Sequence, residues 1–342
     1  MTNFEQSSQY IKDLGIFANR DAQAVKRMNQ RMEKAKFNIF KFLFGKQNDV
    51  VPVNGLPVLK PNLAEFLEPS DQMKLIWFGH STFMLNVEGK IVLVDPVLSS
   101  AASPIPLVIR RFQAPPLQAS ELPDIDFILI SHDHYDHLDM STIKHFKGKN
   151  TRFLVPLGVG SHLTGWGIDS DRVTEHDWWQ STTVDGIEFT ATPAQHFSGR
   201  SFYDKNATLW AGWAVKATTQ SLFFSGDSGY DIHFGQIGER LGPFDIVLLD
   251  NGQYNPAWEE VHMLPEQASQ AVRDLKAKAF FPVHWGGFKL STHPWYEPIQ
   301  RAYQLSTESP YRIVAPKIGE ILSVSDNYQT DTWWTALIGD KG

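Results

Sequence analysis

The stretch ILISHDHYDHLD, residues 128–139, places three histidines and three aspartates within eight positions, directly after a hydrophobic run. Imidazole nitrogens and carboxylate oxygens are the atoms with which proteins bind zinc, iron or manganese. If the chain stays extended after the hydrophobic run, His132 and His134 point to the same side, because side chains two residues apart share one face. Asp136 and His137 follow closely enough to reach a second ion. The stretch therefore predicts a metal site at the carboxyl end of a buried strand.

Three further residues of the metal-ligand type occupy the same kind of position. His196 ends the run IEFTATPAQH, Asp227 ends SLFFSGD, and His284 ends AFFPVH. Each follows an apolar, strand-like segment, and α/β folds gather their chemistry at the carboxyl ends of strands. Taken singly, each residue would more often have a structural role. Their repetition predicts that they join the histidine-rich stretch in one site.

Short apolar runs alternate with helix-like segments from Met73 onwards. The segment 265–277 begins with a proline and carries its apolar residues on one helical face, as is typical of an amphipathic helix. Strands that alternate with helices indicate an α/β layered domain. The predicted strands cover residues 74–79, 81–87, 90–96, 126–131, 152–156, 187–193, 210–217, 221–227, 245–250 and 279–285.

The composition of the 342-residue chain limits the classes of protein to consider. Apolar residues make up 42% of the chain and cysteine is absent, so any metal must be held by nitrogen and oxygen ligands. The net charge of −7 argues against nucleic acid as a partner. No apolar stretch has the length of a membrane span, and the first residues lack the pattern of a secretory signal. We therefore expect a cytoplasmic protein.

The N-terminal part differs from the rest in charge. Residues 20–46 contain eight Lys or Arg and two acidic residues, a local charge of +6. Residues 8–46 are predicted to be mostly helical and to end in the apolar patch FNIFKFLF, 37–44. We divide the chain accordingly into a basic helical N-terminal extension, 1–50, and a main domain, 51–342.

Two interpretations of the basic segment are open. In the first, its phenylalanines pack on the main domain, as a structural brace or a homodimer contact. In the second, residues 20–46 form a peripheral contact with an anionic membrane, on the inner face in a cytoplasmic protein. The second interpretation buries at the membrane interface the apolar side chains Phe37, Ile39, Phe40, Phe42, Leu43 and Phe44.

The HxHxDH run, with His, Asp and His following at strand ends, resembles the metallo-β-lactamase superfamily. The resemblance implies a four-layer αβ/βα sandwich, here with an N-terminal helical extension, and a two-metal site between the inner sheets. It makes 51–342 a hydrolase domain, and Asp95 the residue that orients a ligand histidine. The ligands that it implies are His132, His134 and His196 for the first metal, Asp136, His137 and His284 for the second, and Asp227 as a bridge.

A narrower resemblance covers about residues 56–320. The motifs LPVLKP (56–61), WFGHST (77–82), DPVLSSAASP (95–104), DWW (177–179), GDSGY (226–230), GPFD (242–245) and HWGGF (284–288) are similar, in this order, to N-acyl-phosphatidylethanolamine-hydrolysing phospholipase D and its bacterial relatives. This family resemblance implies two Zn²⁺ ions per chain, with iron or manganese as alternatives, and hydrolysis of a phospholipid or another phosphodiester.

Three site residues receive roles beyond metal binding. Asp136 is expected to accept the proton of the attacking water, and His262 to contact the substrate phosphate or protonate the leaving group. His80, in GHST, is expected to brace the site from beneath. Two other functions stay open: a lactonase or other small-metabolite hydrolase of the same superfamily, and a non-enzymatic binding protein stabilised by its metal.

Overall fold

Two seven-stranded sheets form the centre of the molecule in the computed structural model, which describes residues 4–38, 40, 42, 45, 48–105, 108–325 and 327–338. The first sheet has the order β16 (Ile321–Ser323), β3 (Lys74–Trp77), β4 (Phe83–Val87), β5 (Lys90–Val94), β6 (Phe127–Leu129), β7 (Arg152–Pro156), β8 (Val173–His176). The second has the order β15 (Arg312–Ile313), β14 (Ala279–Val283), β13 (Ile246–Asp250), β12 (Ser221–Phe224), β11 (Gly212–Lys216), β10 (Ile187–Thr192), β9 (Ser181–Val184). Every strand predicted from the apolar runs is present.

The two sheets pack face to face because successive strand side chains alternate between an inner and an outer core. Leu75 and Trp77 of β3 belong to the core between the sheets, together with Trp213 of β11. Ile76, between them in sequence, belongs to a separate core on the outer face of the first sheet. Strands buried on both faces are expected to read as continuous apolar runs, which is the pattern in the sequence.

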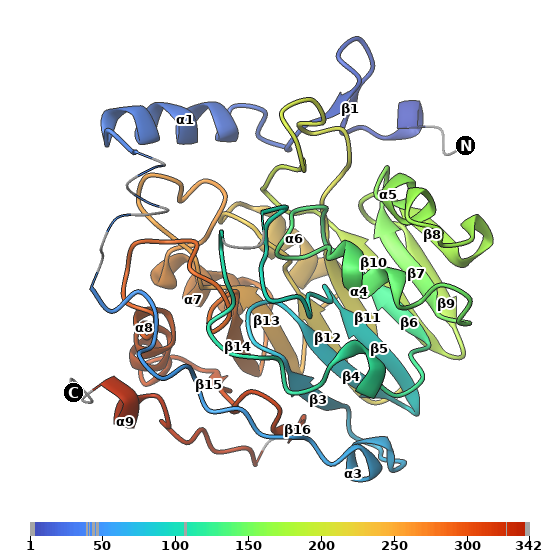
Figure 1. The fold of residues 1–342 in the computed structure, drawn as a ribbon, viewed down its shortest axis with the longest axis vertical. Helices are drawn as coiled ribbons and strands as arrows, with labels where there is room; N and C mark the ends of the chain where they lie inside the picture. The colour runs from blue at the N-terminus through green and yellow to red at the C-terminus, as the bar shows by residue number, and fades with distance from the viewer. Residues whose placement is uncertain are drawn as a thin grey trace.

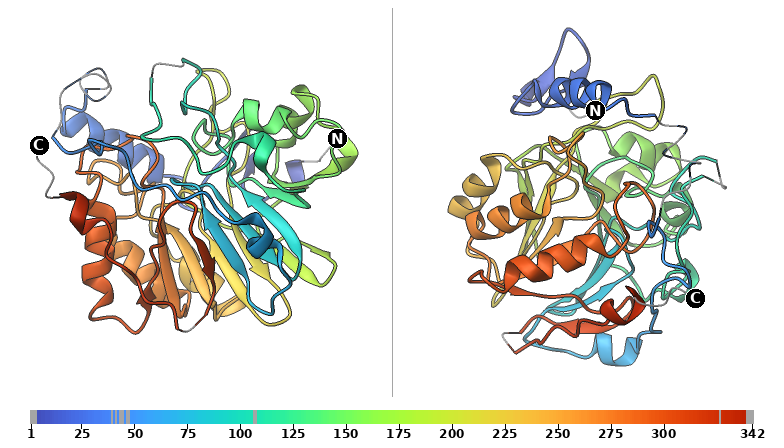
Figure 2. Two further views of the ribbon diagram at one scale, coloured as in Figure 1. Left: turned by 60° about the horizontal axis from the view of Figure 1, so that its bottom comes forward. Right: turned by 90° about the vertical axis from the view of Figure 1, so that its left-hand side faces the viewer.

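Helices cover the outer faces of both sheets (Figures 1 and 2). On the first sheet these are α4 (Met140–Lys144) and α5 (Gly160–Gly165), and on the second α6 (His233–Arg240), α7 (Pro265–Asp274) and α8 (Glu297–Ser306). This confirms the four-layer α/β sandwich. The predicted helix of residues 265–277 begins at Pro265, as expected, and ends at Asp274. Further short elements among the described residues are η1 (Phe4–Gln6), α3 (Leu63–Leu67), η2 (Ala119–Glu121), η3 (Ser170–Arg172) and α9 (Thr335–Ile338).

The helix predicted over residues 8–46 is wrong in its extent. Among the described residues of this stretch, only α1 (Ala24–Lys34) is an α-helix of more than one turn, and a hairpin of β1 (Tyr10–Ile11) and β2 (Ile16–Phe17) precedes it. Gly15, with φ of 65°, permits the turn between these strands. The rings of Phe4, Tyr10 and Phe17 then pack with centroids 5.1–5.6 Å apart. Tertiary packing of aromatic side chains therefore overrides the helical pattern. Ile39, Lys41, Leu43, Phe44 and Lys46 lie outside the described residues.

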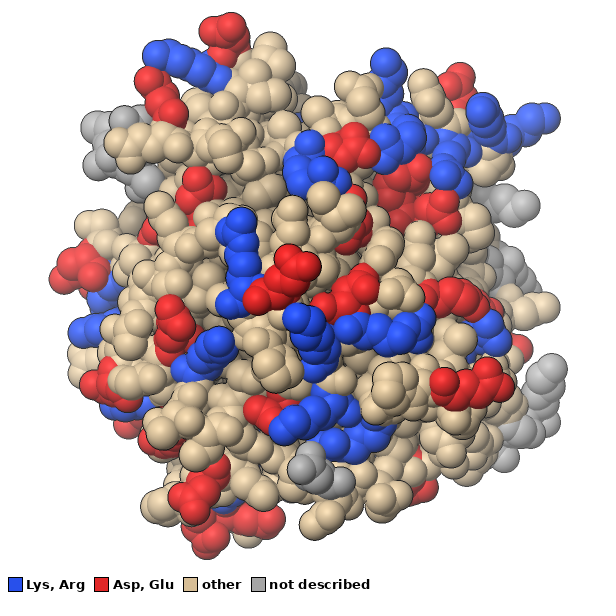
Figure 3. Space-filling view, turned by 180° about the vertical axis from the view of Figure 1, so that it is seen from behind, with Lys and Arg blue, Asp and Glu red and all other residues tan. Residues whose placement is uncertain are grey.

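The basic segment contacts the main domain through charged and apolar side chains. Arg20 pairs with Asp231, and Arg31 lies 2.7 Å from both Glu259 and Glu260. Figure 3 shows Lys and Arg side chains over α1 with acidic side chains among them. Acidic residues of the main domain thus neutralise part of the positive charge of this segment.

The aromatic residues of the patch 37–44 that the structure describes lie differently from one another. The Phe37 ring packs 5.4 Å from that of Trp258, and Phe42 is buried. Phe40 is 71% exposed. In the described part of the chain, no helix combines the length and the apolar character that crossing a bilayer requires.

Candidate metal centre

The histidine-rich loop follows β6 and is fixed by hydrogen bonds from the second sheet. The indole of Trp213 donates to the Ile130 carbonyl (2.8 Å), and the Ala211 amide donates to the Ser131 carbonyl (2.9 Å). Asp133 points away from the ligand cluster and accepts from the Gly199 amide (2.7 Å). The loop is therefore held between the two sheets, where the carboxyl ends of their parallel strands meet.

The first group of predicted ligands converges on one point. Ligand atoms of His132, His134, His196 and Asp227 all lie within 4.8 Å of one another. His134 Nδ1 is 2.9 Å from His132 Nε2 and 3.2 Å from His196 Nε2. One carboxylate oxygen of Asp227 lies 3.8 Å and 3.7 Å from the His132 and His196 nitrogens. Three ring nitrogens and a carboxylate facing one point form a donor set for a cation.

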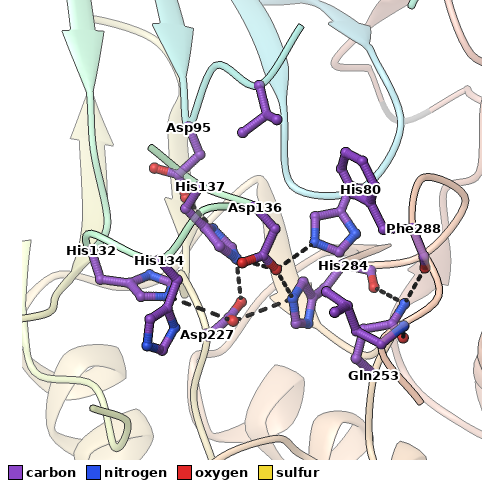
Figure 4. A network of polar contacts seen from close by, with 12 residues as sticks. His80, Asp95, His132, His134, Asp136, His137, Asp227, Gln253, His284 and Phe288 are labelled. Carbon is purple, nitrogen blue, oxygen red and sulfur yellow. Dashed lines mark hydrogen bonds and ion pairs between the residues drawn. The ribbon is translucent and has the colours of Figure 1, made fainter. Parts of the chain in front are cut away.

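The second group lies on the other side of Asp227. Ligand atoms of Asp136, His137 and His284 converge, together with His80. Asp227 Oδ1 is 3.2 Å from His137 Nε2, and Asp227 Oδ2 is 3.2 Å from His284 Nε2. Figure 4 shows Asp227 between the two groups. The structure thus brings all seven predicted ligands together and places the predicted bridge between them.

Two features of this centre fit divalent metal ions. His137 Nε2 and Asp227 Oδ1 are buried 3.2 Å apart, and among the described residues neither atom makes a hydrogen bond of good geometry, so both remain available to a metal ion. Burial alone would raise the pKa of Asp227, but the adjacent His137 and His284 hold that pKa well below its usual value. The carboxylate is therefore charged and available to a cation.

Asp95 makes the contact to a ligand histidine that its expected orienting role requires. It follows β5 and is fully buried, and its Oδ2 accepts from His137 Nδ1 at 2.7 Å. It also accepts from the amide of Ser131 (2.7 Å), and the Ser131 hydroxyl contacts His132 Nδ1 at 2.9 Å. Such partners fix the tautomer of a ligand histidine so that its other nitrogen faces the metal.

His80 lies beside the other residues of the second group and contacts Asp136. Its Nε2 is 2.9 Å from Asp136 Oδ2, and its ring centroid is 4.4 Å from that of His284. Burial, with a further contribution from His284, lowers the pKa of His80 to about 3. A neutral His80 donates its Nε2 proton to Asp136 and holds that carboxylate in place.

Asp250, at the end of β13, is a site residue that the sequence analysis missed. It is fully buried, and its two oxygens accept from different histidines: Oδ1 from His284 Nδ1 (2.9 Å) and Oδ2 from His262 Nδ1 (2.8 Å). The run DIVLLD ends in this aspartate just as SLFFSGD ends in Asp227. The strand-end pattern therefore contained a signal for it.

His262 stands beside both metal groups. Its ring centroid is 5.1 Å from those of His196 and His284. Asp250 occupies Nδ1, so Nε2 is the other ring nitrogen of His262. The expected contact of His262 to a phosphate or a leaving group stays a prediction.

Asn19, in the N-terminal segment, supports the metal ligand His196. Its side-chain amide donates to the His196 carbonyl (2.7 Å), and its Oδ1 accepts from the His196 amide (3.0 Å). Asn19 Oδ1 also accepts from the indole of Trp210 (3.1 Å). No sequence pattern indicates this contact, which joins residues 177 positions apart.

Asn19→Ala should weaken metal binding at the first group. The substitution removes both hydrogen bonds that fix the His196 backbone, and lost outer partners of metal ligands typically reduce affinity about 10–100-fold. We expect a loss of about tenfold, measured by chelator competition. Asn150→Ala, at an exposed position, is the control. Equal metal affinity in Asn19→Ala and wild type would contradict the supporting role.

Gly252→Ala should destabilise the protein near the second group. A Cβ atom at Gly252 would lie 1.7 Å from the His284 carbonyl oxygen, so the backbone of a metal ligand would have to move. Overpacking costs about 1–3 kcal/mol, and we expect at least that loss in thermal or urea unfolding. Gly235→Ala in α6 meets open space and should be neutral or slightly stabilising. A neutral Gly252→Ala would show that this close packing is not needed.

Known proteins resemble this chain in sequence and in fold. The beta-lactamase superfamily domain matches residues 90–285. An uncharacterized protein of Mycobacterium tuberculosis is 39% identical over 335 residues, covering 96% of this chain and 88% of the relative. The N-acyl-phosphatidylethanolamine-hydrolyzing phospholipase D 1 of Caenorhabditis elegans is 34% identical over 268 residues, covering 73% of this chain and 75% of the relative.

A solved structure shows the same fold. Igni18, a metallo hydrolase from Ignicoccus hospitalis, aligns with a TM-score of 0.56 at 20% identity, covering 76% of this chain and all of that one. The sandwich, the converging ligand groups and these relatives agree with one another. The chain belongs to the metallo-β-lactamase superfamily and is a metal-dependent hydrolase.

Proposed function

We propose that the protein holds two zinc ions and hydrolyses a phosphodiester, with a phospholipid as the substrate class. The observation that carries this proposal is the position of Asp227 within 3.2–3.8 Å of nitrogens from both ligand groups. A shared carboxylate suits two ions held close together, and two-metal sites are common in enzymes that cleave phosphate esters. The similarity to a phospholipase D supports the phospholipid, and iron or manganese are the alternative metals.

The side chains of this centre have separate roles in the proposed reaction. When bound, divalent ions would supply Lewis-acid activation of water and of the phosphoryl oxygens. Asp136, held by His80, accepts the proton of the attacking water. His262 donates a proton from Nε2 to the leaving oxygen. Asp250 accepts the Nδ1 proton, which fixes the orientation of His262 and stabilises the imidazolium form in which Nε2 also carries a proton to donate.

The assembly and location of the protein form a second part of the proposal. A peripheral contact of residues 20–46 with the inner membrane face would bring the cytoplasmic enzyme to a lipid substrate. Exposed Lys26, Lys34 and Lys36 support such a contact, while Phe37 and the buried Phe42 support the structural brace. Nucleic acid is not among the proposed partners, and a homodimer is an outcome that sedimentation would detect.

Product analysis tests the proposed reaction. Purified, zinc-loaded protein is given a panel of phosphodiester lipids and lactones, with Asp136→Asn as the control for contaminating activity. Release of phosphatidic acid by wild type alone would support the proposal. Turnover of lactones alone would overturn it in favour of the lactonase. A fully loaded protein that hydrolyses neither class would favour a metal-stabilised binding protein.

A further inference from the structure

Phe202 and Tyr203 are the most exposed large apolar side chains in the described part of the chain. Their exposures are 101% and 99%, and the next, Val53, is 86% exposed. Single exposed apolar residues are ordinary, but two adjacent aromatic side chains that are fully exposed leave a large apolar area in water. The function described above uses neither residue.

These two residues stand at the tip of a loop, residues 198–207, that its own hydrogen bonds make rigid. Asp204 Oδ1 accepts from the amides of Arg200 (3.0 Å) and Ser201 (2.7 Å), and the Asn206 amide donates to the Ser198 carbonyl (3.0 Å). The Ala207 amide closes a further turn onto the Asp204 carbonyl (3.0 Å). The tip is therefore presented in a defined conformation.

The loop is also joined to the histidine-rich loop. The Tyr135 hydroxyl donates to the Arg200 carbonyl (2.9 Å). The Arg200 guanidinium donates to the carbonyls of Asp133 (2.6 Å) and Leu138 (2.7 Å), and it lies 4.0 Å from the centre of the Tyr135 ring. The tip, which follows the ligand His196 by six residues, thus has a fixed position relative to the metal centre.

We propose that Phe202 and Tyr203 insert into the surface of a lipid bilayer and hold the metal centre against it. This inference rests on the proposed phospholipid substrate for its purpose, although binding is measurable without turnover. Aromatic side chains favour the membrane–water interface, where the ring is apolar and a hydroxyl stays hydrated. The membrane contact would consist of the Phe202 and Tyr203 rings, held in place by the hydrogen-bonded loop 198–207.

The size of the tip favours a lipid surface over a protein partner. Its neighbours Ser201, Asp204 and Lys205 are polar or charged. Two aromatic side chains offer about 300–500 Å² at most, whereas stable protein interfaces bury about 1,200–2,000 Å². A bilayer, by contrast, needs no matching surface, because small apolar side chains can be buried at the boundary between its headgroups and acyl chains.

The surroundings of the tip agree with a membrane-facing end of the molecule. The Phe17 amide of the β1–β2 hairpin donates to the Asn206 carbonyl (2.8 Å), so the hairpin and the loop are adjacent. Leu14, in the hairpin turn, is 66% exposed. Figures 1 and 2 place the hairpin, α1 and this loop at one end of the molecule. The lysines of α1 would then attract an anionic surface into which the tip inserts.

Vesicle sedimentation tests the proposal with the intact, metal-loaded protein. Wild type should bind vesicles of phosphatidylcholine and phosphatidylglycerol, and Phe202→Ser/Tyr203→Ser should bind at least about tenfold more weakly. Leu67→Ser is the matched control, because Leu67 is 42% exposed on α3 at the opposite end of the molecule in Figure 1. Unchanged metal content and melting temperature in the double variant would show that the fold is intact.

Three results would overturn the inference. They are absence of wild-type binding, equal binding by the double variant, and an equal loss in Leu67→Ser. Conversion of a dimer to a monomer by the double substitution, with vesicle binding unaffected, would assign the tip to a second copy of the chain. If no phosphodiester lipid is hydrolysed but the double variant still loses vesicle binding, the proposed reaction fails and this inference stands.

Discussion

Asp136→Asn should remove nearly all hydrolysis and leave the fold intact. An amide has nearly the shape of the carboxylate, but it is a poorer metal ligand and cannot accept the proton of the attacking water. Loss of general-base action alone costs about 10²–10⁴-fold in rate. We expect at least that reduction in kcat on whichever substrate the wild type hydrolyses, with little change in melting temperature.

The control for this variant is Asp169→Asn. Asp169 has an exposed side chain, and its substitution should leave turnover unchanged. A near wild-type rate for Asp136→Asn would contradict the proton-accepting role, while the fold and the metal ligands would still stand.

Asp227→Ala should lower the occupancy of both metal positions together. Asp227 Oδ1 and Oδ2 face His137 and His284 in one group, and Oδ2 also faces His132 and His196 in the other. Loss of an outer partner of a metal ligand already costs about 10–100-fold in affinity, so loss of a shared ligand should cost at least as much at each position. Elemental analysis after dialysis measures both losses.

His196→Ala provides the contrast for the bridging role. His196 approaches only the first group, so its removal should lower one occupancy and spare most of the other. If Asp227→Ala also loses only one ion, Asp227 is a ligand of a single position rather than a bridge.

The sequence predicted the parts of the centre that follow from strand geometry. Apolar runs identify buried strands, and the carboxyl ends of parallel strands share one edge of a sheet, so His196, Asp227 and His284 were expected near the histidine-rich loop. Asp250 obeys the same rule at the end of β13. It was overlooked because no motif drew attention to a single aspartate.

Other features depend on tertiary contacts that no local pattern encodes. Asn19 forms a hydrogen bond with His196, 177 residues away in the sequence. The β1–β2 hairpin forms because aromatic rings pack against one another and Gly15 permits the turn between the strands. The exposure of Phe202 and Tyr203 is also invisible in the sequence, since adjacent aromatic residues are more often buried. These contacts are decided by packing between distant segments.

The metal content of the purified wild-type protein tests the central claim most directly. The claim is that one carboxylate, Asp227, joins two groups of histidine and aspartate ligands into a two-metal hydrolytic centre. Elemental analysis of protein reconstituted with zinc and freed of excess metal should find close to two zinc ions per chain. A saturating content of one ion per chain, or of none, would contradict the account.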